Sequence, residues 1–227
     1  MPDRPDQDLI AVRMAELARA VAAPRSLEDV LSGVTAAAKE LIPNLDAAGV
    51  LLIGKGGSFT TLPAAAGLTD QLHQLQMQFG EGPCVQAALA DVIVRTDDFT
   101  YEERWPRYAP ACIQLGIFSG LSFKLYTADR TAGALNLFSR TPNAWSTEAE
   151  TTGIVLAAHA ASAVLASQHG QSLETALSTR DRIGQAKGII MERFKVDDVR
   201  AFEMLRQLSQ ESNTKLIDIA LQVINTR

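Results

Sequence analysis

Apolar residues recur at helical spacing near the start of the chain. Between Val12 and Ala22, and again between Leu27 and Leu41, they stand three or four positions apart, which predicts two helices. Pro24 separates the two because proline cannot continue a helix. Ser26 precedes the second helix and suits its N-terminal cap.

The pattern then alternates between short apolar runs and further helical stretches. The branched run 48–53, the glycine-rich segment 54–57 and the run 59–65 predict a hairpin. Further helices are expected around residues 68–79, 85–90 and 105–115, and further strands at 92–95, 119–126 and 133–139. This order predicts an α+β domain built on an antiparallel sheet, with its flanking helices gathered on one face.

From residue 147 onward the pattern is helical. Over residues 154–165 the apolar positions alternate steps of four and three, typical of a coiled-coil seam. We interpret residues 147–180 as a connecting helix and dimerisation stalk, weakened at Gly170 by about 1 kcal/mol relative to alanine. The alternative is one more helix packed on its own sheet, and both can hold for Ile154 to Leu165.

Residues 173–227 divide into three predicted helices. The first ends near Phe194, the second begins near Asp197 or Asp198, and the third follows residues 212–214. We expect the inner face of the second helix to carry Val199, Phe202, Leu205 and Leu208. Short connections predict an antiparallel pair. A core of about 55 residues is small, so we expect it to need the stalk or a second chain.

Composition indicates a globular, cytoplasmic protein. Of the 227 residues, 47% are hydrophobic and 21% charged. No apolar run approaches the roughly 20 residues that span a bilayer, and the start of the chain is acidic, unlike a signal peptide. The first 172 residues carry 12 basic and 18 acidic side chains, whereas the last 55 carry 9 and 8. A slightly basic tail is compatible with contact to phosphate.

Candidate chemistry is sparse. The three histidines lie on separate segments, and the sequence suggests no metal, no cofactor, no paired acids and no activated nucleophile, so we do not expect an enzyme. Cys84 and Cys112 do not form a disulfide framework. The segment 80–84 either closes a turn or offers free N–H groups to a ligand, and we favour the turn. Cys84 near a helix start is either an inert core residue or a redox-sensitive thiol.

The N-terminal part resembles a GAF domain. The resemblance rests on Gly80-Glu-Gly-Pro-Cys84, the Asp97 region, Arg104-Trp-Pro106, Gly116-Ile-Phe-Ser119 and Gly133-Ala-Leu-Asn-Leu137. It implies a sensor domain over residues 1–165, with a pocket between sheet and helices that holds a small molecule in some members. The residues expected at such a pocket are Gly82, Pro83, Cys84, Trp105 and Phe118.

The tail resembles an ANTAR domain over residues 173–227. The resemblance rests on Arg182-Ile-Gly-Gln-Ala-Lys-Gly-Ile-Ile-Met191, Ala201-Phe202, Leu205-Arg206 and Leu216-Ile-Asp-Ile-Ala220. It implies binding of stem-loop RNA in nascent transcripts and antitermination of transcription, governed by the attached GAF domain and by formation of a homodimer.

The first tail helix carries the side chains that suit RNA. Long donors and small residues alternate along it, and we expect RNA contacts from Arg180, Arg182, Gln185, Ala186, Lys187, Gly188 and Arg193. Amides and guanidinium groups read the unpaired bases of RNA loops, while cations hold phosphates. On charge alone the same pattern is typical of a solvated helix face.

The tail departs from the ANTAR pattern at two positions, and two other functions are alternatives to RNA binding. Lys195 stands where relatives often have glycine at a left-handed helix end, which costs on the order of 1 kcal/mol. Ile217 occupies a position that is often basic in relatives, so we do not expect the third helix to contact RNA. The alternatives are a DNA-binding regulator, disfavoured because the third helix has few basic residues, and a thiol switch centred on Cys84 or Cys112.

Overall fold

The computed structural model describes residues 12–16, 18–19, 26–53, 59–61, 67–89, 92–126 and 131–226. The chain forms two compact units, Met1–Ser167 and Gln168–Arg227. The expected hairpin turn at residues 54–57 lies outside the described residues, as do parts of the first helix and of the run 59–65. Residues 12–16 and 18–19 of that first helix are helical.

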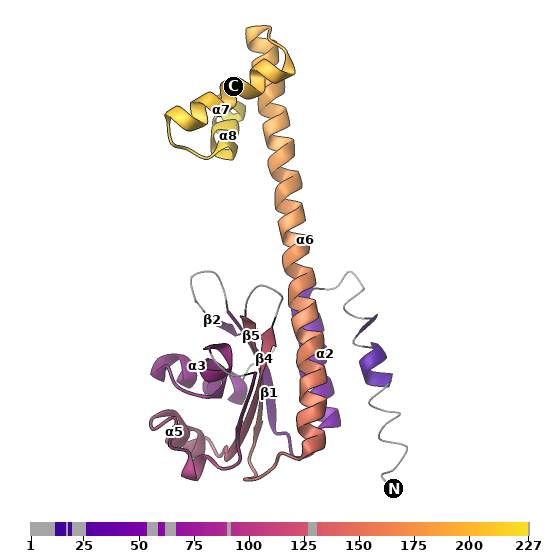
Figure 1. Cartoon of the computed structure of the whole chain (residues 1–227), viewed down its shortest axis with the longest axis vertical. Coiled ribbons are helices and arrows are strands. Elements are labelled where there is room, and N and C mark those ends of the chain that lie inside the picture. Colours follow the sequence, from indigo (N-terminus) through magenta and orange to yellow (C-terminus); the bar gives the residue numbers. More distant parts are fainter. Residues whose placement is uncertain are drawn as a thin grey trace. The chain divides into compact units, whose positions relative to one another are not determined.

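The first unit is built on a five-stranded antiparallel sheet (Figure 1). Its strand order is β2-β1-β5-β4-β3. Strand β5 pairs on one side with β1, matching Leu137 to Ala48, and on the other with β4, matching Leu137 to Leu121. The strands are β1 (Ala47–Ile53), β2 (Phe59–Thr61), β3 (Ile93–Thr96), β4 (Ser119–Tyr126) and β5 (Thr131–Ser139). The α+β fold expected from the sequence is confirmed.

Helices cover both faces of this sheet, so the expectation that they gather on one face is wrong. Alternate residues of β1 enter two different cores, with Val50 in one and Leu51 in the other, because successive strand side chains point to opposite faces. Helices α2 (Leu27–Leu41) and α6 (Thr147–Phe194) supply one core, and α3 (Leu68–Phe79), α4 (Pro83–Leu89) and α5 (Tyr108–Gln114) the other (Figure 1).

Local sequence signals set several helix ends. Ser26 caps α2 by accepting a hydrogen bond from the Asp29 N–H at 3.1 Å. The end of α3 is the left-handed residue Gly80 (φ +64°), whose N–H bonds to the Gln76 carbonyl. A single turn of 3-10 helix, η3 (Phe99–Tyr101), follows Asp98 as its cap.

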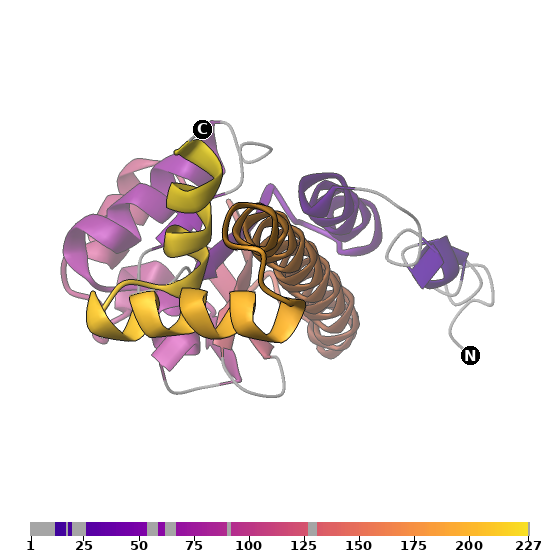
Figure 2. The ribbon, with the colours of Figure 1, turned by 90° about the horizontal axis from the view of Figure 1, so that it is seen from above.

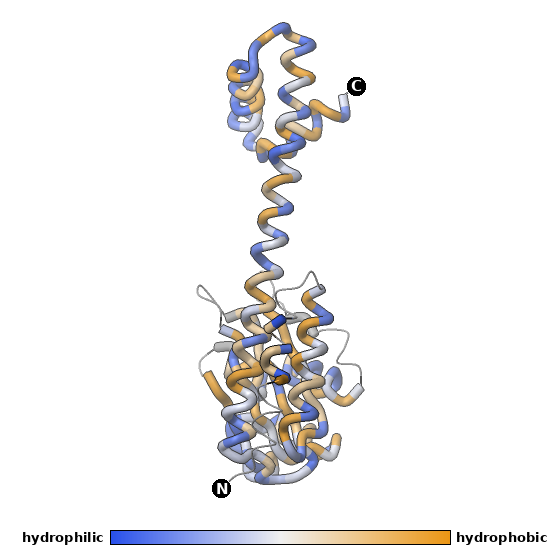
Figure 3. Tube along the Cα trace, turned by 90° about the vertical axis from the view of Figure 1, so that its right-hand side faces the viewer, coloured by the Kyte–Doolittle hydropathy of each residue, from blue (hydrophilic) through white to orange (hydrophobic). Residues whose placement is uncertain are grey.

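Helix α6 is continuous over 48 residues, from Thr147 to Phe194. The expected connecting helix and the first tail helix are therefore one element. The helix continues through Gly170. A Cβ at Gly170 would meet no atom within 4 Å, so packing does not require glycine at this position. Hydrophobic and hydrophilic positions are interspersed along the helix (Figure 3).

By length and composition alone, α6 could cross a membrane, contrary to the expectation that no segment is apolar enough. Half of its most apolar window is nevertheless buried inside the protein. Leu156, Ala160 and Val164 belong to the core of the first unit, where they are at most 3% exposed. Packing against the sheet accounts for this apolar composition, as in the core helix of a globular domain.

The second unit contains the C-terminal part of α6 together with α7 (Asp198–Glu211) and α8 (Leu216–Asn225). Helices α7 and α8 cross at a large angle instead of lying antiparallel (Figures 1 and 2). Asp197 caps α7 by accepting from the Arg200 N–H at 2.8 Å. Lys195 takes the left-handed conformation expected at the end of α6, with φ +55°.

Three polar residues form a buried chain of hydrogen bonds between α3 and the sheet. Ser122 Oγ donates to Asn136 Oδ1 at 2.6 Å, so the Asn136 amide nitrogen faces His73 Nε2, 3.0 Å away. The ring nitrogen Nε2 therefore accepts, and the imidazole proton lies on Nδ1. Burial lowers the pKa of His73 to about 4 because desolvation disfavours the imidazolium.

We expect the first unit to lose stability as the pH falls from 6.5 to about 4. Unfolded His73 protonates near 6.5 and the folded residue only near 4, so the unfolded state binds more protons within this window. Urea unfolding at a series of pH values, followed by the fluorescence of Trp105 and Trp145, measures the effect. His73→Gln should flatten the slope of unfolding free energy against pH; equal slopes in both chains would contradict this expectation.

Candidate nucleic-acid interface

The inner face of α6 in the second unit is sealed by α7 and α8. Ala186 and Ile190, four positions apart, are 0% and 4% exposed. They form one buried cluster with Ala201, Leu205, Ile219 and Ala220. The expectation that Ala186 contacts RNA is therefore wrong for its side chain, because this methyl group is part of the core.

The remaining expected donors lie at the surface. Exposed residues are Arg180, Arg182, Gln185, Gly188 and Arg193. The side chain of Lys187 is 22% exposed. All the residues of α6 that we expected to contact RNA, except Ala186, are therefore accessible to a partner.

These donors divide between two sides of the helix. Arg180 and Lys187 are seven positions apart, about two helical turns, whereas Arg182 lies about 200° round the axis from Arg180. Arg180, Gln185 and Lys187 line a surface pocket of about 820 Å³. Arg193 contacts the end of the chain instead, with Nη2 3.4 Å from the Thr226 carbonyl oxygen.

Residues of α7 complete the pocket side. Lys187 Nζ lies 2.5 Å from Asp198 Oδ1 and 6.0 Å from the centroid of the Phe202 ring. The Lys187–Asp198 ion pair therefore holds the ammonium group beside the pocket. Because Asp198 is 64% exposed, water screens this pair, and its own contribution to stability is small.

Phe202 is a pocket residue that the sequence pattern did not identify. We expected it in the core with Leu205, but Phe202 is 39% exposed and lines the pocket, whereas Leu205 is fully buried. Leu208 and Val199 are also exposed, at 47% and 67%. Of the four residues expected on the inner face of α7, only Leu205 is buried. Gly184, which belongs to the ANTAR motif, also lines the pocket, although it was not among the expected RNA contacts.

The residues expected at a sensor pocket of the first unit are mostly packed inside it. The Cys84 N–H donates to Gln76 Oε1 at 2.8 Å, so this helix-start group is already bonded within the chain. Gly82 has φ +122°, and a Cβ there would lie 2.6 Å from Gln76 Oε1, so glycine is required. Pro83 is buried beside it, Trp105 is 4% exposed, and Phe118 is half-buried.

Burial also removes the physical basis for a thiol switch. Cys84 and Cys112 are 1% and 0% exposed. Desolvation raises the pKa of each thiol to about 12, so both remain protonated at neutral pH. Thiolate chemistry requires a lowered pKa and access, so the interpretation of Cys84 as a redox sensor is wrong for this folded state.

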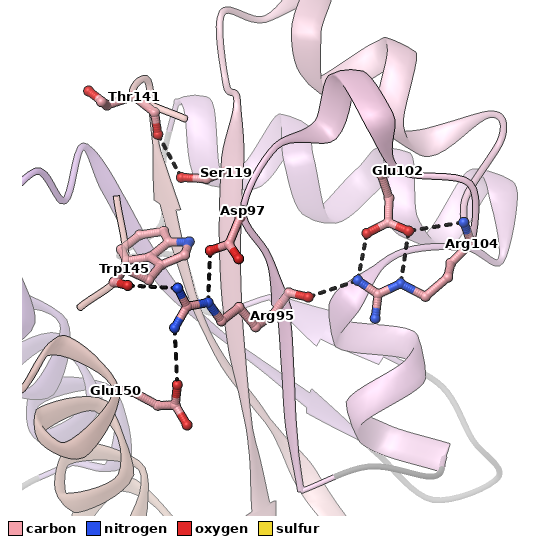
Figure 4. Close-up of polar contacts among 8 residues, drawn as sticks. All are labelled: Arg95, Asp97, Glu102, Arg104, Ser119, Thr141, Trp145 and Glu150. Carbon is pink, nitrogen blue, oxygen red and sulfur yellow. Dashed lines mark hydrogen bonds and ion pairs between the residues drawn. The ribbon is translucent and has the colours of Figure 1, made fainter. Parts of the chain in front are cut away.

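Two arginines, Arg95 in β3 and Arg104 in the segment that follows η3, connect the sheet to neighbouring loops and to α6 (Figure 4). Arg95 donates to Asp97 Oδ1 and to the Trp145 carbonyl oxygen, both at 2.8 Å, and lies 3.4 Å from Glu150 Oε2. Arg104 pairs with Glu102 and donates to the Arg95 carbonyl oxygen at 2.8 Å. Asp97 and Glu102 are thus neutralised by arginines of the same chain.

Fold and surface together define a two-domain protein, with an α+β domain followed by a helical module that carries a cationic pocket. A family model of the GAF domain matches residues 24–165, and a model of the ANTAR domain matches residues 171–224. The chain belongs to the GAF domain family and carries an ANTAR domain at its C-terminal side. An ANTAR domain implies an RNA-binding regulator of antitermination, and a GAF domain suggests signal sensing.

Solved structures share the fold of the first unit. The GAF domain of a Coxiella burnetii phosphoenolpyruvate-protein phosphotransferase is 17% identical, with a TM-score of 0.59, 72% of this chain covered and 96% of that one. The GAF domain of an Acinetobacter phosphoenolpyruvate-protein phosphotransferase is 16% identical, with a TM-score of 0.55, 74% of this chain covered and 96% of that one. The free methionine-R-sulfoxide reductase of Neisseria meningitidis is 16% identical, with a TM-score of 0.54, 75% of this chain covered and 96% of that one. A comparison with curated proteins finds no match.

We expect Asp198→Asn to strengthen RNA binding. Asp198 holds Lys187 in an ion pair, so we expect that removing the charge of Asp198 frees the ammonium group for an RNA phosphate. Fluorescence anisotropy with a labelled stem-loop RNA should give a Kd lower by about twofold to fivefold at low salt, with the difference shrinking as salt rises. Glu211→Gln, which also removes an exposed carboxylate from α7, is the control. Weaker binding by Asp198→Asn would contradict this role.

Proposed function

We propose that this protein is a signal-responsive, RNA-binding regulator of transcription antitermination that acts in the cytoplasm without catalysing a reaction. The ANTAR domain, with its exposed donors on α6, recognises stem-loop RNA, and the GAF domain governs that recognition. The observation that carries the proposal is the ANTAR match over residues 171–224, whose α6 segment presents Arg180, Gln185 and Lys187 around one open pocket.

A titration with charge-matched variants tests this function. Arg180→Ala with Lys187→Ala removes two cations at the pocket, and Arg206→Ala with Lys215→Ala removes two exposed cations from α7 and the start of α8. We expect the pocket variant to bind a stem-loop RNA at least about tenfold more weakly and to lower the salt slope by about 1.5, because two phosphate contacts are lost. The other variant should lose much less.

Equal losses in the two double variants would contradict RNA contact through Arg180 and Lys187. The RNA assignment itself would be overturned by no binding of wild type to stem-loop RNA at low salt, or by tighter binding to a duplex DNA of the same length. The last result would favour a DNA-binding regulator.

We further propose that the active form is a homodimer paired along α6. Leu173 and Leu177 lie one helical turn apart, and they are 63% and 51% exposed. Two exposed leucines at this spacing form an apolar strip that a second copy of the same helix can cover.

We expect Leu173→Gln with Leu177→Gln to shift the protein toward monomer in analytical ultracentrifugation. The control is Leu208→Gln, at a comparably exposed leucine of α7, which should leave the dimer intact. A monomeric wild type at micromolar concentration, or a double variant that remains dimeric, would refute pairing through these leucines.

A further inference from the structure

The surface pocket beside α6 combines features suited to a planar ligand. It is formed within the second unit, has a volume of about 820 Å³, and is lined by the aromatic residue Phe202. Small-molecule and base sites are concave, with apolar walls and a few placed polar groups. The pocket lining also includes Arg180, Asp181, Gly184, Gln185 and Lys187.

Phe202 presents a partly exposed ring to the pocket, with the Lys187 ammonium group 6.0 Å from the centroid of this ring. Phe202 is 39% exposed, whereas its neighbours Ala201 and Leu205 on α7 are fully buried. An exposed aromatic ring beside cations is the usual platform on which an unpaired base stacks.

Gly184 is a helical glycine that the chain's own packing does not require. A Cβ at Gly184 would meet no atom within 4 Å, so no neighbouring element needs the space. Glycine is the least favourable residue in a helix interior apart from proline, so alanine would stabilise this turn. A missing side chain here permits close approach of something outside the chain to the α6 backbone.

The charges of the lining favour a base over a phosphate. Arg180 and Lys187 are cationic, but the carboxylate of Asp181 lines the same pocket. Carboxylate and amide groups, here Asp181 and Gln185, accept from and donate to base edges. A phosphate inside the pocket would meet the Asp181 carboxylate, whereas a base with an amino group would gain from it.

We infer that this pocket is a nucleobase site, in which one unpaired base of the RNA loop stacks on Phe202 and lies against the helix backbone at Gly184. The inference rests on the proposed RNA-binding function. Arg180 and Lys187 at the rim then hold the neighbouring phosphates, while Gln185 and Asp181 contact the edge of the base.

Paired glycine variants separate this site from a purely structural role. Gly184→Ala and Gly170→Ala each add a methyl group to α6 at a position where it meets no atom. Both should raise the urea midpoint, because alanine favours the helix. Only Gly184→Ala should weaken binding of a stem-loop RNA, by about tenfold, since only Gly184 lines the pocket.

Abasic substitutions in the RNA identify the base that stacks. Each loop position of the RNA is replaced in turn by an abasic nucleotide, and its binding to wild type and to Phe202→Leu is measured. We expect one position at which wild type loses about tenfold or more and Phe202→Leu loses nothing further, because the same stacking contact is already absent.

The outcomes distinguish this inference from the function beneath it. If wild type binds the stem-loop RNA but Gly184→Ala binds equally well, or if Phe202→Leu and the abasic losses are additive at every position, the base site is refuted and RNA binding stands. If wild type does not bind stem-loop RNA at low salt, both are refuted.

Discussion

The close packing of Ala186 and Ile190 against α7 and α8 decides what the rest of α6 can do. Once these two positions are sealed in the small core, the helical repeat fixes the direction of every neighbouring side chain. Arg180 and Lys187 then lie on the side that faces Phe202, and Arg182 lies well round the axis. A methyl group at position 186 therefore determines where the cations and the pocket are found.

The same helix also contributes to the core of the GAF domain. Leu156 and Ala160 pack over the sheet, and the helix then continues without interruption through Gly170 into the ANTAR domain. Residues on one element thus belong to two cores, one in each domain. Arg95 ties β3 to the first turn of α6 through Glu150, which adds a polar link to the apolar packing.

Several polar groups of the GAF domain are hydrogen-bonded within the chain. Gln76 accepts from the Cys84 N–H, and Asn136 bridges Ser122 and His73. Groups that attract attention in the sequence as possible ligands are therefore engaged in holding α3 and α4 on the sheet. In the ANTAR domain, by contrast, exposed cations, an amide and an aromatic ring line one surface pocket.

The sequence by itself determined the α+β fold, the helical tail and both domain families, because periodicity and turn residues act locally and the motifs keep their order along the chain. It also predicted the left-handed end at Lys195, since a helix stop depends only on its nearest residues. The tertiary structure alone decided that helices cover both faces of the sheet, that Cys84 and Ala186 are buried, and that Phe202 is exposed. A helical repeat gives the direction of a side chain, but whether that direction meets water or another helix depends on elements distant in sequence.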